Sequence, residues 1–124
     1  MSMTTMEVAN RLIELVKAQK EEQAIDELYH PNISTHEPAG EMKDGTGIET
    51  CKNKAKWFNS AFENHGVEVL GPYPNEGKFA VHYNYDITAR ETGKRFNMLE
   101  VALYEVKDGK IVWEKFYYDP AGLG

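Results

Sequence analysis

Apolar residues recur at helical spacing in three segments of the first half of the chain. The first predicted helix, residues 5–19, begins at a capping box formed by Thr4 and Glu7. A second helix over residues 22–29 ends before Pro31, because a residue that precedes proline is biased away from the α region. The third is expected to begin at another capping box, formed by Thr46 and Glu49, and to run to about residue 64.

From Gly66 onward apolar positions alternate with polar ones, which is the pattern of half-buried β-strands. Strands are predicted over residues 67–70 and 79–88, and residues 32–37 form a further short strand. A hairpin over residues 97–119 turns at Asp108-Gly109, a strong hairpin signal. Because helices come first and strands later, the predicted fold class is α+β. We expect one domain, residues 1–124, with a curved antiparallel sheet packed on N-terminal helices.

The position of each turn also predicts which side chains share a face of the sheet. A two-residue turn at Asp108-Gly109 places Leu103 opposite Glu114, and a turn at residues 91–93 places Tyr83 opposite Val101. One face then combines apolar side chains with a single carboxylate, and we expect this face to be concave and to meet the helices. Its members include Tyr83, Tyr85, Val101, Glu114, Phe116 and Tyr118.

The opposite face of the predicted sheet mixes aromatic and charged side chains, among them Met98, Glu100, Tyr104, Trp113 and Tyr117. Aromatic residues with a few charges are typical of a protein interface. We therefore predict a homodimer through the outer sheet face. The alternative is that these side chains are scattered surface residues covered only by their neighbours.

The composition is that of an ordinary soluble domain, with 41% hydrophobic and 27% charged residues in 124. The net charge of -6 argues against nucleic acid or an anionic membrane as a partner. No apolar run approaches the roughly 20 residues that span a bilayer, and residues 1–8 carry no secretory signal. The lone cysteine, Cys51, excludes an intrachain disulfide, and a cytoplasmic location is expected.

No motif for a metal or cofactor is visible, and we expect neither. The four histidines have no metal-ligand spacing, and no P-loop, Rossmann fingerprint or nucleophile elbow occurs. Cys51 falls on an apolar helix stripe and is interpreted as inert core. Lys52, Lys54 and Lys56 are interpreted as a solvated helix flank.

Glu114 is the strongest candidate for chemistry. A carboxylate on an apolar face needs a partner, a water-filled cavity or a proton, and burial raises its pKa toward the range useful for proton transfer. Alternatively, Glu114 lies at the open end of the sheet and touches water. His36 and Glu37 are adjacent on a strand, so only one faces inward. His36 is the better candidate because histidine titrates near neutrality, and the alternative is a loop histidine with no ligand role.

Four segments carry a resemblance to a known family: residues 28–31 (L-Y-H-P), 36–40 (H-E-P-A-G), 45–49 (G-T-G-I-E) and 106–112 (V-K-D-G-K-I-V). With the order of elements, they make the chain resemble the nuclear transport factor 2-like superfamily, and within it the SnoaL-like polyketide-cyclase and ketosteroid-isomerase branch. The resemblance implies a cone-shaped fold of cystatin-like topology, a pocket between the concave sheet face and the helices, and frequent homodimers.

The resemblance also implies a function for the pocket: cofactor-free acid–base isomerisation or cyclisation of a small hydrophobic carbonyl compound. Glu114 matches a cavity-facing polar position on the last strand of SnoaL-like cyclases, whereas Phe116 stands where some members carry a second polar residue. The catalytic candidates are Glu114 and His36, and the substrate-binding candidates are Glu37, Trp57, Tyr83, Tyr85, Val101, Phe116 and Tyr118. The alternatives are a non-catalytic module that binds a small hydrophobic ligand, a dimeric interaction protein and, for Trp57, plain core packing.

Overall fold

A computed structural model describes residues 2–123, in which three helices precede most of a six-stranded sheet. The helices are α1 (Thr5–Lys17), α2 (Glu21–Leu28) and α3 (Ile48–Ala61). The strands are β1 (Tyr29–His36), β2 (Asp44–Thr46), β3 (Phe62–Asn75), β4 (Lys78–Ala89), β5 (Arg95–Lys107) and β6 (Lys110–Tyr117). A single turn of 3-10 helix, η1 (Pro120–Leu123), follows β6.

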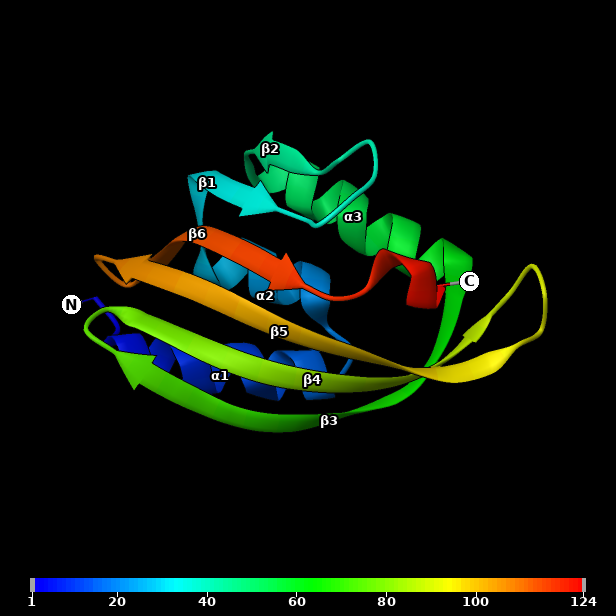
Figure 1. Cartoon of the computed structure of the whole chain (residues 1–124). Coiled ribbons are helices and arrows are strands. Elements are labelled where there is room, and N and C mark those ends of the chain that lie inside the picture. Colours follow the sequence, from blue (N-terminus) through cyan, green and yellow to red (C-terminus); the bar gives the residue numbers. More distant parts are fainter. Residues whose placement is uncertain (1, 124) are drawn as a thin grey trace.

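The strands lie in the order β2-β1-β6-β5-β4-β3, and every pair is antiparallel except β1 with β6. The sheet is therefore mixed but mostly antiparallel, which confirms the predicted α+β class. Figure 1 shows the long strands curving across the molecule, with α1 and α2 behind one face and α3 leading directly into β3. The turn η1 lies beside the C-terminal end of α3 (Figure 1).

The predicted helices form close to their expected bounds. Thr4 and Glu7 make the reciprocal capping box that begins α1, with Thr4 Oγ1 accepting from the Glu7 N–H at 3.1 Å. The second predicted capping box is wrong. Gly47 is the N-cap of α3 and no side chain caps it, while the Thr50 hydroxyl donates to the Thr46 carbonyl at 2.9 Å.

The register between β4 and β5 differs by one residue from the sequence prediction. Tyr83 pairs with Glu100 and not with Val101, because Thr88 pairs with Arg95 across the turn. Side chains alternate along a strand, so a slip of one residue turns every β5 side chain to the other face. Met98, Glu100, Ala102 and Tyr104 are consequently buried, whereas Leu99 and Val101 are 57% and 41% exposed.

A β-bulge explains why Glu114 still lies on the inner face. The Val106–Ile111 pair is as predicted, but the next pair joins Glu105 to Trp113, so Val112 is an extra residue in β6. Beyond the bulge Glu114 pairs with Tyr104, and both are buried. The bulge thus offsets the slip in β5, and the inward positions of Glu114 and Phe116 result from the two deviations together.

Candidate active site

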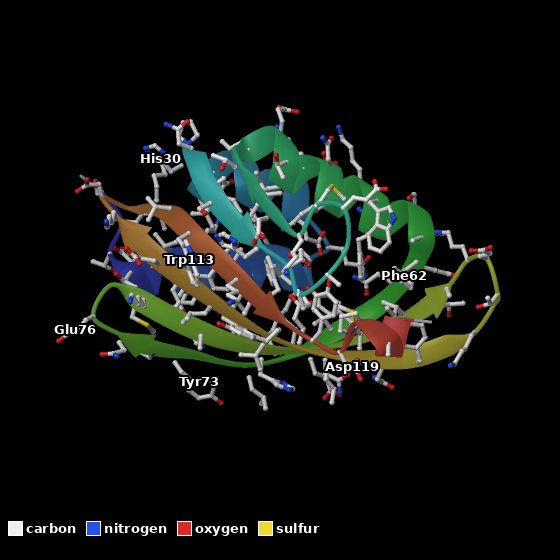
Figure 2. All side chains as sticks on the ribbon, turned by 45° about the horizontal axis from the view of Figure 1, so that its top comes forward. His30, Phe62, Tyr73, Glu76, Trp113 and Asp119 are labelled. Atoms are coloured by element: carbon white, nitrogen blue, oxygen red, sulfur yellow. The ribbon has the colours of Figure 1, made fainter. Side chains whose placement is uncertain are left out.

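A cavity of about 560 Å³ lies between the inner sheet face and the helices. Its wall combines residues of all three helices and of β1, β3, β4, β5 and β6 with the loop at residues 37–42 and Pro120 of η1. Figure 2 labels Phe62 of this wall, where α3 gives way to β3. The aromatic part of the wall includes Trp57, Phe58, Phe62, Tyr85, Phe116 and Tyr118. Its volume is within the range of pockets for small molecules.

Glu114 lines this cavity and is held by three donors. The Tyr29 hydroxyl donates to Oε1, and the Thr35 hydroxyl donates to Oε2 at 2.7 Å. The Cys51 thiol donates weakly to Oε2 at 3.7 Å. Glu114 is 2% exposed, and each of its two oxygens has a hydrogen-bond partner. This is the arrangement expected of a buried carboxylate.

A second carboxylate of the cavity wall, that of Glu37, joins the same network. Lys54 Nζ donates to Glu37 Oε2 at 2.8 Å and to the Thr35 hydroxyl at 2.5 Å. An ammonium group cannot accept, so the Thr35 hydrogen is directed to Glu114. The Tyr118 hydroxyl donates to Glu37 Oε1 at 3.0 Å. Lys54 and Thr35 therefore connect the two carboxylates.

Burial dominates the electrostatics of these groups. Desolvation raises the pKa of Glu114 above its ordinary 4.5, while Lys54 and the hydroxyls of Tyr29 and Thr35 act in the opposite direction. Desolvation and the nearby Glu114 raise the pKa of the Cys51 thiol to about 12, so this cysteine stays a thiol at neutral pH. The pKa of the Tyr29 hydroxyl is raised for the same two reasons.

Glu100 is a third carboxyl group of the cavity wall, and sequence reasoning missed it. It is 8% exposed, and no side-chain hydrogen bond found among residues 2–123 involves its carboxyl group, which is open to the cavity. Desolvation, followed by the nearby Glu37 and Glu114, raises its pKa to about 8. The incorrect β5 register had assigned Glu100 to the outer face.

His36 does not face the cavity, and the expectation that it does is wrong. Its ring lies on the outer side of β1, where Nδ1 is 2.7 Å from Asp44 Oδ1 and Nε2 is 2.8 Å from the Ser34 hydroxyl. The ring also packs on Trp113, with centroids 5.7 Å apart (Trp113 is labelled in Figure 2). Because neighbouring residues alternate, Glu37 is the inward member of the pair.

Of the other residues predicted to line the cavity, all but one do so. Trp57, Tyr83, Tyr85, Phe116 and Tyr118 line the cavity. Val101 does not, because it lies on the exposed face of β5.

Lys54 is a second missed residue, since it was interpreted as part of a solvated flank. It follows Cys51 by three residues and precedes Phe58 by four, so the helical period already placed it on the inward stripe of α3. Its side chain is 14% exposed and its Nζ lies 5.2 Å from the ring centroid of Phe116. Tyr29 and Thr35 carry no comparable signal, because their roles depend on the pairing of β1 with β6.

Within residues 2–123, no group of three or more histidine, cysteine, aspartate or glutamate side chains is arranged to hold a metal ion. In that same part of the chain no helix has the length and apolar character needed to cross a membrane.

Comparisons with known proteins agree with this fold. A candidate SnoaL-like polyketide cyclase from Mesorhizobium loti, whose name also carries the words carbohydrate phosphatase, is 38% identical, with a TM-score of 0.86 over 94% of this chain and 100% of its own. A candidate SnoaL-like polyketide cyclase from Jannaschia sp. CCS1 is 14% identical, with a TM-score of 0.80 over 96% of this chain and 88% of its own.

A candidate isomerase from Bacillus subtilis is 18% identical, with a TM-score of 0.78 over 96% of this chain and 91% of its own. No curated protein matches significantly. The model of the SnoaL-like domain matches residues 3–118. The chain therefore belongs to the SnoaL-like domain family of the nuclear transport factor 2-like superfamily.

Proposed function

We propose that the cavity binds a small hydrophobic carbonyl compound and transfers a proton next to its carbonyl group without a cofactor, in an isomerisation or a cyclisation. The observation that carries the proposal is Glu114, a buried carboxylate held by two hydroxyl donors on the wall of an otherwise largely apolar cavity. The names of its relatives, candidate polyketide cyclases and isomerases, support this class of reaction.

Glu114 is the proposed acid–base group. Burial raises its pKa, which makes the carboxylate a stronger base than one in water. The Tyr29 and Thr35 hydroxyls fix the direction of both oxygens, so little reorganisation is needed when a proton arrives. Lys54 orients Thr35 and pairs with Glu37, which makes it a positioning residue and not a catalytic one.

The apolar and aromatic wall supplies the binding energy for the body of the substrate. A wall of this kind gains affinity mainly through the removal of apolar surface from water. A phosphatase reaction, which the name of the Mesorhizobium loti relative also suggests, receives no support from the wall. Phosphate binding needs cationic side chains, and Lys54 is the one lysine among the lining residues and already pairs with Glu37.

The test is deuterium exchange at the carbon next to the carbonyl group of tetralone and acetylnaphthalene, followed by proton NMR in heavy water. The wild-type protein should accelerate exchange, and Glu114→Gln should lower that rate by about 100-fold or more. Glu105→Gln, a change of the same kind on the outer side of β5, is the control. Exchange that is catalysed equally well by Glu114→Gln would remove Glu114 from this role.

A non-catalytic binding module is the second candidate, and one observation favours it. Each Glu114 oxygen already accepts a hydrogen bond and the side chain is 2% exposed, as in a purely structural carboxylate. This alternative predicts that a hydrophobic ligand raises the melting temperature while neither variant nor wild type catalyses exchange.

A further inference from the structure

Glu100 is the buried carboxyl group that the proposed reaction leaves without a role. It lies in the middle of β5, pairs with Tyr83 of β4, and lines the cavity with its side chain more than nine-tenths buried. No donor of residues 2–123 satisfies it, although the other two inner carboxylates each have at least two donors. No side-chain oxygen of residues 2–123 is both fully buried and unsatisfied, so the carboxyl oxygens of Glu100 are open to the cavity and available to a ligand there.

The charges around Glu100 favour a cation in this part of the cavity. The charged residues of the wall are Glu21, Glu37, Glu41, Glu100, Glu114 and Lys54. Lys54 is the one cationic side chain among the lining residues and is already engaged with Glu37 and Thr35, so the wall offers Glu100 no free cation. An anionic ligand would meet repulsion from this wall, whereas a cation would be attracted.

The titratable groups that face Glu100 come from several different segments of the chain. Glu37 follows β1, Glu114 lies on β6 and Lys54 on α3, and all three act on its ionisation. Tyr83 and Tyr85 of β4 and Tyr118 after β6 respond to its charge in turn. None of the three tyrosines donates to Glu100, since the Tyr83 hydroxyl bonds to that of Tyr104 at 2.9 Å and the Tyr118 hydroxyl bonds to Glu37.

Aromatic rings complete the surroundings expected for an ammonium group. Phe58 lies 5.7 Å from Tyr85 and 5.1 Å from Phe62, and Tyr83 lies 5.7 Å from Tyr85, measured between ring centroids. Ring faces attract cations, and the attraction is largest where water is excluded. A carboxylate beside such rings is therefore suited to an organic ammonium ion with a hydrophobic body.

We propose that the ligand of the cavity is a hydrophobic amine, whose protonated amino group pairs with Glu100 while its body packs on the aromatic wall. This inference rests on the proposed function, because the amine and the proposed substrate would occupy the same cavity. It narrows the proposed substrate class to a carbonyl compound that carries an amino group. The pKa of Glu100, about 8, means that in the unliganded protein the carboxyl holds its proton at neutral pH. Binding of the ammonium form therefore releases that proton to solvent.

The test is isothermal titration with three probes that share one aromatic body: naphthylmethylamine, naphthylmethanol and naphthoate. At pH 8 the wild-type protein should bind the amine at least about tenfold more tightly than the alcohol, and naphthoate should be the weakest. Glu100→Gln should abolish the preference for the amine and leave the affinity for the alcohol within about twofold. Glu105→Gln on the outer side of the same strand should preserve all three affinities.

The pH course of the wild-type affinity provides a readout that needs no variant. Affinity for the amine should rise as the pH approaches about 8, because less work is then needed to remove the Glu100 proton. Affinity for the alcohol should not rise over the same range. Titrations in buffers of different ionisation enthalpy should show proton release on amine binding below pH 8.

Two results would overturn the inference. The alcohol could bind the wild-type protein as tightly as the amine, which would make Glu100 a neutral hydrogen-bond donor, or the preference for the amine could persist in Glu100→Gln. The proposed reaction can fail separately. An amine preference that depends on Glu100, together with exchange that is unaffected by Glu114→Gln, contradicts only the reaction. Exchange that requires Glu114 without an amine preference contradicts only this inference.

Discussion

At the scale of single residues, the cavity contains two carboxyl groups that are buried to a similar extent and satisfied very differently. Glu114 accepts from Tyr29 and Thr35, so its ionised form is stabilised where it lies. Glu100 has no donor, and burial raises its pKa to about 8. The difference depends on the hydroxyl groups supplied by β1, which lie beside β6 and not beside β5. Two glutamate side chains of one cavity therefore differ in how readily they ionise.

The pKa of Glu100 has a consequence for stability. Its folded-state pKa of about 8 lies above the ordinary 4.5, so its contribution to stability is present below pH 4.5 and is lost as the pH rises through 8. Over that window the contribution falls by about 1.4 kcal/mol per pH unit. In urea unfolding at a series of pH values, the free energy of unfolding of Glu100→Gln should therefore increase relative to that of the wild type as the pH rises. Parallel profiles for the two proteins would contradict the pKa.

At the scale of elements, turns and bulges decide which side chains reach the cavity. Alternation along β4 was sufficient to predict the inward positions of Tyr83 and Tyr85. It was not sufficient for β5, because Thr88 pairs with Arg95, so the connection between the paired strands is one residue shorter than the predicted turn at residues 91–93 requires. In β6, no residue type in the sequence indicates that Val112 is an extra residue of the strand. Where the register of a strand depends on loop length or on a bulge, tertiary packing determines it. A local pattern of apolar and polar residues carries no information about that packing.

The correctly predicted hairpin turn at Asp108-Gly109 can be tested by replacing Gly109, with Gly93 of the β4–β5 turn as the matched control. Gly93 and Gly109 have positive φ angles of 73° and 75°, which disfavour a side chain in both cases. A Cβ atom on Gly109 would also lie 2.9 Å from the backbone nitrogen of Met3, whereas nothing lies within 4 Å of one on Gly93. Gly93→Ala should therefore cost about 1 kcal/mol of unfolding free energy and Gly109→Ala clearly more. Equal losses in urea unfolding would mean that the N-terminal segment does not pack on this turn.

At the scale of the whole molecule, the sheet separates a cavity face from an outer face that is more apolar than the sequence indicated. Registered pairs align Leu70, His82, Val101 and Tyr117 in one row across four strands. Three of these side chains are apolar or aromatic and more than two-fifths exposed. Tyr73 of β3, also well exposed, projects outward from the sheet in Figure 2. Contiguous apolar exposure of this kind marks interaction surfaces.

We expect this row to form a homodimer interface. Val101→Asp places a charge at its centre and should convert the dimer into a monomer in analytical ultracentrifugation at micromolar concentration. Thr92→Asp, in the exposed turn between β4 and β5, should leave the dimer intact. A wild-type protein that sediments as a monomer at this concentration would contradict the expectation.

The fold could be predicted from local patterns because capping, helical period and a glycine turn are properties of neighbouring residues. The site could be predicted only in part. Glu114 was found because a carboxylate stands out in an apolar run, but its donors Tyr29 and Thr35 come from a strand about 80 residues away. His36 was favoured over Glu37 on its titration range, while the strand phase, which depends on how β1 pairs with β6, decided the question.

Glu114 is proposed here as a buried carboxyl group whose raised pKa suits it to proton transfer. The most direct test is a carbon-13 NMR titration of the glutamate side-chain carboxyls, with the Glu114 resonance assigned through its loss in Glu114→Gln. We predict that this resonance titrates above the ordinary value of 4.5, in the direction set by desolvation. A resonance that titrates at or below 4.5 would exclude the proposed role, because Glu114 would then be a fixed carboxylate and no acid–base group.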